Sequence, residues 1–245
     1  MQAKTISARL TDAFMLSSKV KHFIFELQHN PPFNYLPGQF ITIHFEKDGK
    51  QLKRSYSIAN VPAQDNRIEF AAGYVENGPG TALLFNLQPD DVIQISGPFG
   101  RLILKDELPQ RYVLVATSTG VTPYRAMLPV LRQRLQQNPN LKIVIMLGAQ
   151  TPEDVLYEKE FLALAKDFPR QVIFRAQLSR AHNESLLSHQ FRGYVQHAFS
   201  ELSLNPQEDI VYLCGNPGMI DESFELLKST GFATQQVIRE KYISR

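Results

Sequence analysis

Residues 111–137, RYVLVATSTGVTPYRAMLPVLRQRLQQ, place an apolar run rich in β-branched residues directly before a helical stretch. Three more units of this kind follow. Their apolar runs are KIVIMLGAQ (142–150), QVIFRAQLS (171–179) and DIVYLCG (209–215), and their helical stretches are TPEDVLYEKEFLALAKDF (151–168), a segment around FRGYVQHAFSEL (191–202) and GMIDESFELLKSTG (218–231). Because parallel neighbours need a crossover connection, these four strand–helix units predict an α/β domain with a parallel sheet covered on both faces. The final run, ATQQVIREKYISR (233–245), predicts a last strand.

The chain before residue 105 has a different rhythm, with short runs in which apolar and polar residues alternate. These runs are VKHFIFEL (20–27), QFITIHFE (39–46), KRSYSIAN (53–60), NRIEFAAGYV (66–75) and DVIQISG (91–97). This alternation predicts an antiparallel β-barrel or sandwich, and a short helix over residues 81–87 is expected to cap the barrel. The sequence therefore predicts two domains, a barrel over residues 1–105 and an α/β domain over 106–245.

Composition narrows the classes of function. The 26 basic and 24 acidic residues of the 245-residue chain leave a formal charge of +2, so we expect neither nucleic acid nor a membrane surface as partner. One cysteine forms no internal disulfide and cannot alone hold zinc or an iron–sulfur cluster, and no histidine has metal-ligand spacing. We therefore expect no metal, an organic redox cofactor and, without a signal or membrane segment, a cytoplasmic protein.

Two polar motifs of the predicted barrel are suited to a phosphate-bearing ligand. In Arg54-Ser55-Tyr56-Ser57, arginine offers a fork of donors to phosphate and tyrosine a flat apolar face, although strand alternation turns Ser57 to the other side. In Gly78-Pro79-Gly80-Thr81, the start of the short helix presents backbone N–H groups. The alternatives are a polar strand face with one packed tyrosine and a tight turn with a threonine N-cap.

In the predicted parallel sheet, ligands bind at the carboxyl ends of the strands. The turns at these ends are ATSTGVTP (116–123), LGAQTPED (147–154), QLSRAHNE (177–184) and CGNPGM (214–219). Cys214 is either a small apolar residue of a buried strand or, as its place before Gly-Asn-Pro favours, a residue that positions a ligand.

Taken together and in order, the motifs resemble the ferredoxin–NADP reductase family across nearly the whole chain. They are Pro37-Gly38-Gln39-Phe40, Arg54-Ser55-Tyr56-Ser57, Gly78-Pro79-Gly80-Thr81, Gly97-Pro98-Phe99-Gly100, Thr117-Ser118-Thr119-Gly120-Val121-Thr122-Pro123, Cys214-Gly215-Asn216-Pro217 and Glu240-Lys241-Tyr242. The R-x-Y-S motif is specific for the flavin barrel and the C-G-x-P turn for the nicotinamide domain.

The resemblance implies an FAD-binding barrel followed by a pyridine-nucleotide domain. In the FAD domain it assigns Arg54, Gly80 and Thr81 to the pyrophosphate, Tyr56 to one isoalloxazine face and Ser57 to the N5 edge. In the second domain it assigns Thr119 and Gly120 to the nicotinamide nucleotide, and Cys214 and Gly215 to the nicotinamide. It also places Tyr242 over the other flavin face, where the nicotinamide must bind; the alternative is a tyrosine on the barrel surface or in an unordered tail. Hydride transfer belongs to the two cofactors, and the residues nearest to it would be Ser57, Cys214 and Tyr242.

One residue departs from the family pattern. Where the family has glycine in the first nucleotide turn, this chain has Ser118, which brings a β carbon close to the nucleotide. Either Ser118 adopts a tolerated conformation or the dinucleotide binds more weakly.

Discrimination between NADPH and NADH depends on the ribose 2′ position, where phosphate favours arginines and hydroxyl favours a carboxylate. Arg180 and Arg192 match family positions that contact a 2′-phosphate. Glu153 and Asp154 are suited to a hydroxyl, but they also make an ordinary helix start after Thr151 and Pro152. The sequence therefore favours NADPH, with NADH as the alternative.

The function that follows is an oxidoreductase that passes hydride from NADPH to FAD and then electrons to a separate ferredoxin or flavodoxin. Alternatives with the same motifs are an NADH-using reductase component of an oxygenase and a reductase of free flavin or a siderophore. A different class is a non-catalytic electron-relay or regulatory subunit that keeps the fold.

Overall fold

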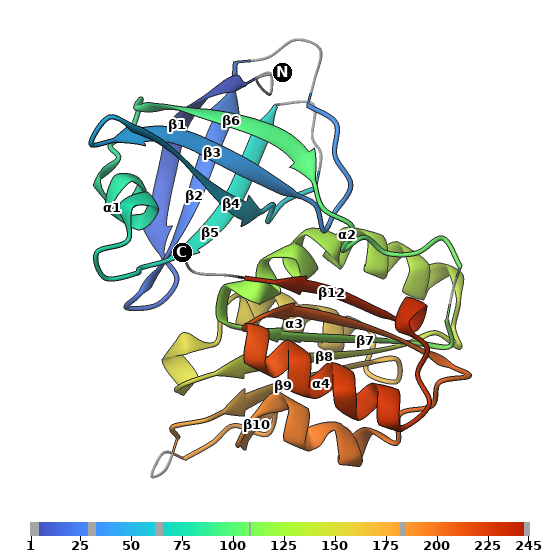
Figure 1. Cartoon of the computed structure of the whole chain (residues 1–245). Coiled ribbons are helices and arrows are strands. Elements are labelled where there is room, and N and C mark those ends of the chain that lie inside the picture. The colour runs from blue at the N-terminus through green and yellow to red at the C-terminus, as the bar shows by residue number, and fades with distance from the viewer. Residues whose placement is uncertain (1–4, 29–32, 62–65, 108, 182–184, 243–245) are drawn as a thin grey trace. The chain divides into compact units, whose positions relative to one another are not determined.

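The computed structural model describes residues 5–28, 33–61, 66–107, 109–181 and 185–242, which form two compact units. The first is built on residues 1–104, with residues 122–127 grouped with it, and the second on residues 105–121 and 128–243. The first carries an antiparallel sheet and the second a parallel one, as the sequence predicts (Figure 1).

Six antiparallel strands make the first unit, in the order β4-β3-β6-β1-β2-β5. They are β1 (Ile6–Met15), β2 (Val20–Leu27), β3 (Phe40–Lys47), β4 (Lys50–Ser57), β5 (Arg67–Gly73) and β6 (Val92–Phe99), and the helix α1 (Pro79–Asn86) lies between β5 and β6 in the chain. A bridge between Ile58 and Phe70 brings the two ends of the sheet together. The predicted antiparallel barrel is confirmed.

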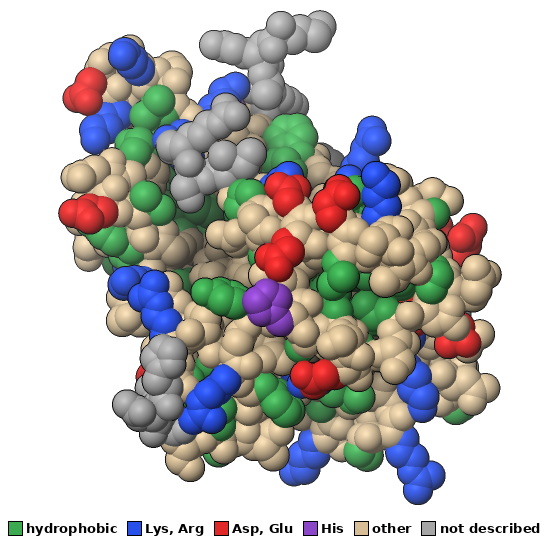
Figure 2. Space-filling view, turned by 60° about the horizontal axis from the view of Figure 1, so that its bottom comes forward, with side chains coloured by type: hydrophobic (Ala, Val, Ile, Leu, Met, Phe, Trp, Pro, Cys, Tyr) green, Lys and Arg blue, Asp and Glu red, His purple; other side chains and the backbone are tan. Residues whose placement is uncertain are grey.

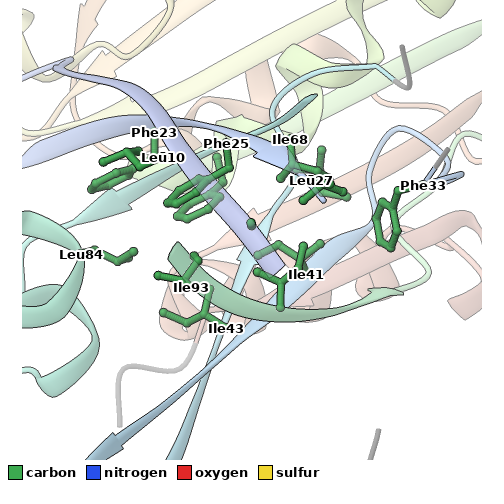
Figure 3. Close-up of a cluster of buried hydrophobic side chains, with 14 of the residues drawn as sticks. Leu10, Phe23, Phe25, Leu27, Phe33, Ile41, Ile43, Ile68, Leu84 and Ile93 are labelled. Atoms are coloured by element: carbon green, nitrogen blue, oxygen red, sulfur yellow. The ribbon is translucent and has the colours of Figure 1, made fainter. Parts of the chain in front are cut away.

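The barrel core is filled by the inward-facing residues of these strands (Figure 3). Phe25 and Phe70 stack with ring centroids 5.5 Å apart and planes at 6°. Leu84 of α1 is fully buried in the same cluster, so the short helix caps the barrel as expected. Burying rings of this size is the main term that stabilises such a core.

The alternation of apolar and polar residues does not predict β1. Only Ala8 and Leu10 of this strand are buried, and a bulge between Leu10 and Asp12 shifts the register against β2. A bulge puts an extra residue into one strand, so the period of two that identifies a strand is lost.

Six parallel strands make the second unit, in the order β10-β9-β8-β7-β11-β12. They are β7 (Arg111–Thr117), β8 (Lys142–Ala149), β9 (Val172–Leu178), β10 (Gln190–Arg192), β11 (Asp209–Gly215) and β12 (Val237–Lys241). The helices α2 (Thr122–Gln137) and α3 (Glu158–Asp167) lie on one face of the sheet, and α4 (Pro217–Ser229) lies on the other, as Figure 1 shows. Because both faces are covered, Tyr112 to Ala116 of β7 are all buried.

Two helical predictions for this unit are wrong in part. Residues 151–168 do not form one helix: a 3₁₀ turn, η2 (Pro152–Asp154), and α3 are separated by Tyr157, whose φ of 56° breaks the helix. Residues 191–202 form the end of the short strand β10 and a 3₁₀ helix, η3 (Val195–Leu202). The last predicted strand is confirmed as β12.

Charge is dispersed over the surface. On the face shown in Figure 2, Lys and Arg side chains are interspersed with Asp and Glu, in keeping with the small net charge. Among the helices of the described residues, none has the length and apolar character needed to cross a membrane.

Ser118 has a backbone conformation that suits glycine. It begins the 3₁₀ turn η1 (Ser118–Val121) with a φ of 49° and an exposed side chain. A non-glycine residue in this region is strained by contact between its Cβ and the backbone. Ser118 thus has a φ that favours glycine.

We predict that Ser118→Gly raises stability by about 0.5–1 kcal/mol, because relief of this strain exceeds the extra freedom that glycine gives the unfolded chain. Thermal unfolding should show a midpoint higher by about 1–4 °C. Ser118→Ala is the matched control: it removes the hydroxyl, keeps the Cβ and should give no gain. Equal midpoints for wild type and Ser118→Gly would contradict the strain.

Candidate functional site in each unit

Arg54, Tyr56 and the start of α1 lie together in the first unit. A Cβ built on Gly80 would lie 2.7 Å from Arg54 Cγ and 3.3 Å from Tyr56 Oη. Only glycine therefore lets the helix backbone lie this close to the two side chains. The motifs from β4 and α1, 24 residues apart in the chain, form one surface.

Tyr56 is held in this surface by its neighbour Phe70. The two rings stack with centroids 4.9 Å apart and planes at 23°. Burial raises the pKa of the Tyr56 hydroxyl to about 12, although the charge of Arg54 lowers it. The phenol therefore stays neutral and keeps its proton for donation at physiological pH.

Ser57 ends β4 and is 4% exposed, opposite Phe40 of β3 in the strand register. Strand alternation accounts for its separation from the side on which Arg54 and Tyr56 meet Gly80.

Thr81 closes the loop before α1. Its hydroxyl is within hydrogen-bond distance of the carbonyls of Val75 and Gly78, at 3.0 and 3.2 Å, and accepts from the Val75 N–H at 3.2 Å. The N-cap is Gly78, so the alternative of a threonine N-cap is wrong. Because the hydroxyl serves the loop, the groups of this turn that are suited to a ligand are the backbone N–H groups of its first residues.

These residues fit a flavin dinucleotide. A guanidinium and a helix start suit its pyrophosphate, and the backbone at Gly80 leaves no Cβ in their way. The aromatic face of Tyr56 suits an isoalloxazine ring.

In the second unit, the turns that follow the adjacent strands β7 and β11 contact each other closely. Ala116 of β7 and Cys214 of β11 are paired in the parallel register. A Cβ on Gly120 would lie 2.4 Å from the Cys214 carbonyl oxygen, and a Cβ on Gly215, whose φ is +120°, would lie 2.5 Å from Thr117 Oγ1. The predicted residues Gly120, Cys214 and Gly215 are thus brought together, with Thr119 beside them in the chain.

A hydrogen bond that sequence reasoning missed links these two turns. The Asn216 N–H donates to Thr117 Oγ1 at 2.8 Å, and the Asn216 side chain accepts from the Met219 N–H at the start of α4. The Asn-Pro pair after a strand is a signal for such a cap. Nothing local signals the bond to Thr117, which lies 99 residues earlier.

Cys214 is fully buried, and its thiol contacts the chain's C-terminal strand. Burial and the nearby Glu240 carboxylate raise the pKa of the Cys214 thiol well above its usual value, although a hydrogen bond with the Tyr242 side chain lowers it. The Tyr242 N–H also donates to the Gly215 carbonyl at 2.8 Å. These bonds place Tyr242 beside Cys214, whose thiol stays protonated and is no nucleophile.

The sequence motif includes Glu240, but sequence reasoning gave this residue no role. It pairs with Cys214 in the register of β11 and β12, which places an acid beside the buried thiol. The signal available was its spacing of two from Tyr242, which puts both on one side of a strand.

Arg180 and Arg192 lie at the ends of neighbouring strands. Arg192 ends β10 opposite Leu178 of β9, and Arg180 follows Leu178 by two residues. Arg192 Nε donates to the Ala181 carbonyl at 2.7 Å, and the Arg180 N–H donates to the Gln150 carbonyl at 2.8 Å. Both residues are exposed, so the structure brings two cations to one corner of the sheet.

Glu153 and Asp154 serve the start of η2. The Thr151 hydroxyl donates to Asp154 Oδ2 at 3.3 Å, and a hydrogen bond with Thr151 lowers the pKa of Glu153. Thr151 is the N-cap and Pro152 the first residue of the turn, as the helix-start interpretation expects. In the residues that the structure describes, no group of acidic, histidine or cysteine side chains is arranged to hold a metal ion.

Comparisons with known proteins agree with this geometry. The family profile of oxidoreductase FAD-binding domains matches residues 7–103, and that of oxidoreductase NAD-binding domains matches residues 114–223. A ferredoxin–NADP reductase of Azotobacter vinelandii is 32% identical over 223 residues, which cover 85% of this chain and 84% of that protein. The ferredoxin–NADP reductase B of Sorangium cellulosum is 32% identical over 250 residues, with 99% of both chains covered.

Among solved structures, a ferredoxin NADP+ reductase from Neisseria gonorrhoeae with bound FAD and NADP superposes with a TM-score of 0.83 at 21% identity. The superposition covers 98% of this chain and 99% of that one. At this identity the likeness shows the fold. With the two profiles and the relatives, it establishes that the chain is an FAD- and NAD(P)-binding oxidoreductase that belongs to the ferredoxin–NADP reductase family.

Proposed function

We propose that this protein passes hydride from NADPH to FAD and then electrons to a separate ferredoxin or flavodoxin. The observation that carries the proposal is the meeting of Gly120, Cys214, Gly215 and Tyr242 at the carboxyl edge of the parallel sheet. FAD, when bound, accepts a hydride and releases its electrons one at a time. The two full-length relatives named as ferredoxin–NADP reductases support ferredoxin as the acceptor.

In the flavin unit, we assign the phosphate contacts to Arg54 and to the backbone N–H groups of Gly80 and Thr81. Tyr56 would lie against the isoalloxazine, and the hydroxyl of Ser57 would donate near its reactive edge. The close approach of Gly80 to Arg54 and Tyr56 supports the roles of these three residues, whereas the role of buried Ser57 rests on the family resemblance alone.

In the nucleotide unit, Thr119 and Gly120 would border the nucleotide, and Cys214 and Gly215 would position the nicotinamide. Tyr242, hydrogen-bonded to Cys214, would occupy the nicotinamide's place until the ring displaces it. The protonated thiol of Cys214 brings no charge to this place, so it would orient the ring and leave hydride transfer to the two cofactors.

We further propose domains over residues 1–105 and 106–245 and a cytoplasmic location. The division of the chain near residue 104 and the limits of the two matched profiles support the domain boundary. The one cysteine, which forms no disulfide within the chain, and the need for a supply of reduced nicotinamide support the location.

A second candidate is a reductase component that serves an oxygenase. The glycine betaine monooxygenase reductase subunit of Chromohalobacter salexigens is 27% identical to this chain, which covers 60% of it. Such a component would use the same two units and differ in its acceptor.

We predict that the FAD-bound protein supports NADPH-dependent reduction of a purified ferredoxin or flavodoxin, followed by the absorbance of the acceptor. Arg54→Ala, which loses a charge-assisted phosphate contact of about 1.5–3 kcal/mol, should hold FAD at least about tenfold more weakly and show little activity without added FAD. Reduction of an oxygenase component, but of neither ferredoxin nor flavodoxin, would favour the second candidate. If Arg54→Ala binds FAD as tightly as the wild type, the role of Arg54 is contradicted.

We predict that Arg180→Ala/Arg192→Ala raises KM for NADPH at least about tenfold and leaves KM for NADH nearly unchanged, because only NADPH presents a phosphate to these arginines. Steady-state rates with each nucleotide and one acceptor test this. An equal effect on both nucleotides would show that the arginines serve folding or bind elsewhere.

A further inference from the structure

The strand that carries Arg192 is short for an element that must hold a binding residue in place. β10 has three residues and pairs on one side only, at the edge of the sheet. Close to it, the Ala176 N–H donates to the His189 carbonyl at 2.8 Å and the Gly193 N–H to the Leu178 carbonyl at 3.0 Å. So short an edge strand is weakly fixed by its backbone alone.

Glu158, the first residue of α3, holds the beginning of β10. Its Oε1 accepts from His189 Nε2 at 2.7 Å and from Gln190 Nε2 at 3.1 Å. A carboxylate only accepts, so the proton of the His189 ring lies on Nε2. The side chains of Glu158 and His189 are 25% and 13% exposed, so water competes little for these bonds.

A second contact holds the middle of the strand from β9. The guanidinium carbon of Arg175 lies 4.1 Å from the centre of the Phe191 ring, and Arg175 Nη2 pairs with Glu201 at 2.6 Å. The Arg175 side chain is 11% exposed, which strengthens an attraction between a cation and an aromatic ring.

The strand's third residue is Arg192. Its Nε holds the carbonyl of Ala181, which follows Arg180 directly. A shift of β10 would therefore move the guanidinium of Arg192 and the backbone next to Arg180 together.

We propose that Glu158 is a positioning residue for nucleotide specificity. Through His189 and Gln190 it fixes β10, and so it sets the spacing of Arg180 and Arg192 that matches a 2′-phosphate. Glu158 itself touches no ligand. The proposal rests on the proposed function, because it needs the two arginines to bind the 2′-phosphate.

The test compares the dissociation constants of NADP+ and NAD+ by calorimetry on the FAD-bound protein. Glu158→Ala should weaken NADP+ binding about five- to tenfold and leave NAD+ binding unchanged. Glu158→Gln keeps an oxygen that accepts from His189 and Gln190 and should restore NADP+ binding to within about twofold of wild type. Glu225→Ala, at an exposed position of α4, is the matched control and should change neither constant.

His189→Ala gives an independent variant should Glu158→Ala fold poorly, and it should reproduce the selective loss. Combined with Glu158→Ala it should add nothing further, because Glu158→Ala already removes the bond to His189 together with the bond to Gln190. A lower melting temperature with an unchanged NADP+ to NAD+ ratio, or an equal loss for both nucleotides, would overturn the proposal.

Arg192→Ala separates this proposal from the function on which it rests. Selective loss of NADP+ binding in Arg192→Ala but not in Glu158→Ala would leave the function standing and refute the role of Glu158. An unchanged ratio in Arg192→Ala would refute the 2′-phosphate site itself, and the role of Glu158 with it.

Discussion

The carbonyl oxygen of Cys214 lies so close to Gly120 that no side chain fits between them. This contact brings the first nucleotide turn against the end of β11, and Gly215 makes the reciprocal contact with Thr117. In the other unit, Gly80 likewise leaves room for a close approach, because α1 begins against Arg54 and Tyr56. In each unit, glycine thus lets two segments of the chain approach closely at the surface where we propose that a dinucleotide binds.

Tyr56 and Cys214, which we place next to the reacting rings, are uncharged, and arginines lie where phosphate is expected. Burial keeps the hydroxyl of Tyr56 and the thiol of Cys214 protonated. Arg54 in one unit and the exposed Arg180 and Arg192 in the other supply the cations. This distribution suits a protein that binds and orients two cofactors and leaves electron transfer to them.

Local sequence predicts the strands and helices in which the order of apolar and polar residues follows the burial of the side chains. VKHFIFEL predicts β2 (Val20–Leu27) to the residue, because Phe23, Phe25 and Leu27, at alternate positions, are buried in one core. The bulge in β1 and the left-handed conformation of Tyr157 interrupt the periodicity of apolar residues. The sequence pattern therefore misses β1 and predicts too long a helix over residues 151–168. Contacts between distant segments, such as Thr117 with Asn216 and Glu158 with His189, leave no local pattern at all. The sequence alone does not tell which backbone conformation Ser118 adopts. The structure gives it a φ of 49°, in the left-handed region.

We propose that this chain itself moves hydride between the two nucleotides that it binds. Anaerobic stopped-flow mixing of the FAD-bound protein with NADPH tests it most directly, because absorbance of the oxidised flavin reports the transfer without any acceptor. We expect complete bleaching of the flavin band, faster than with NADH at equal concentration. A flavin spectrum that stays oxidised with both nucleotides would contradict it and would assign the chain to electron relay or regulation.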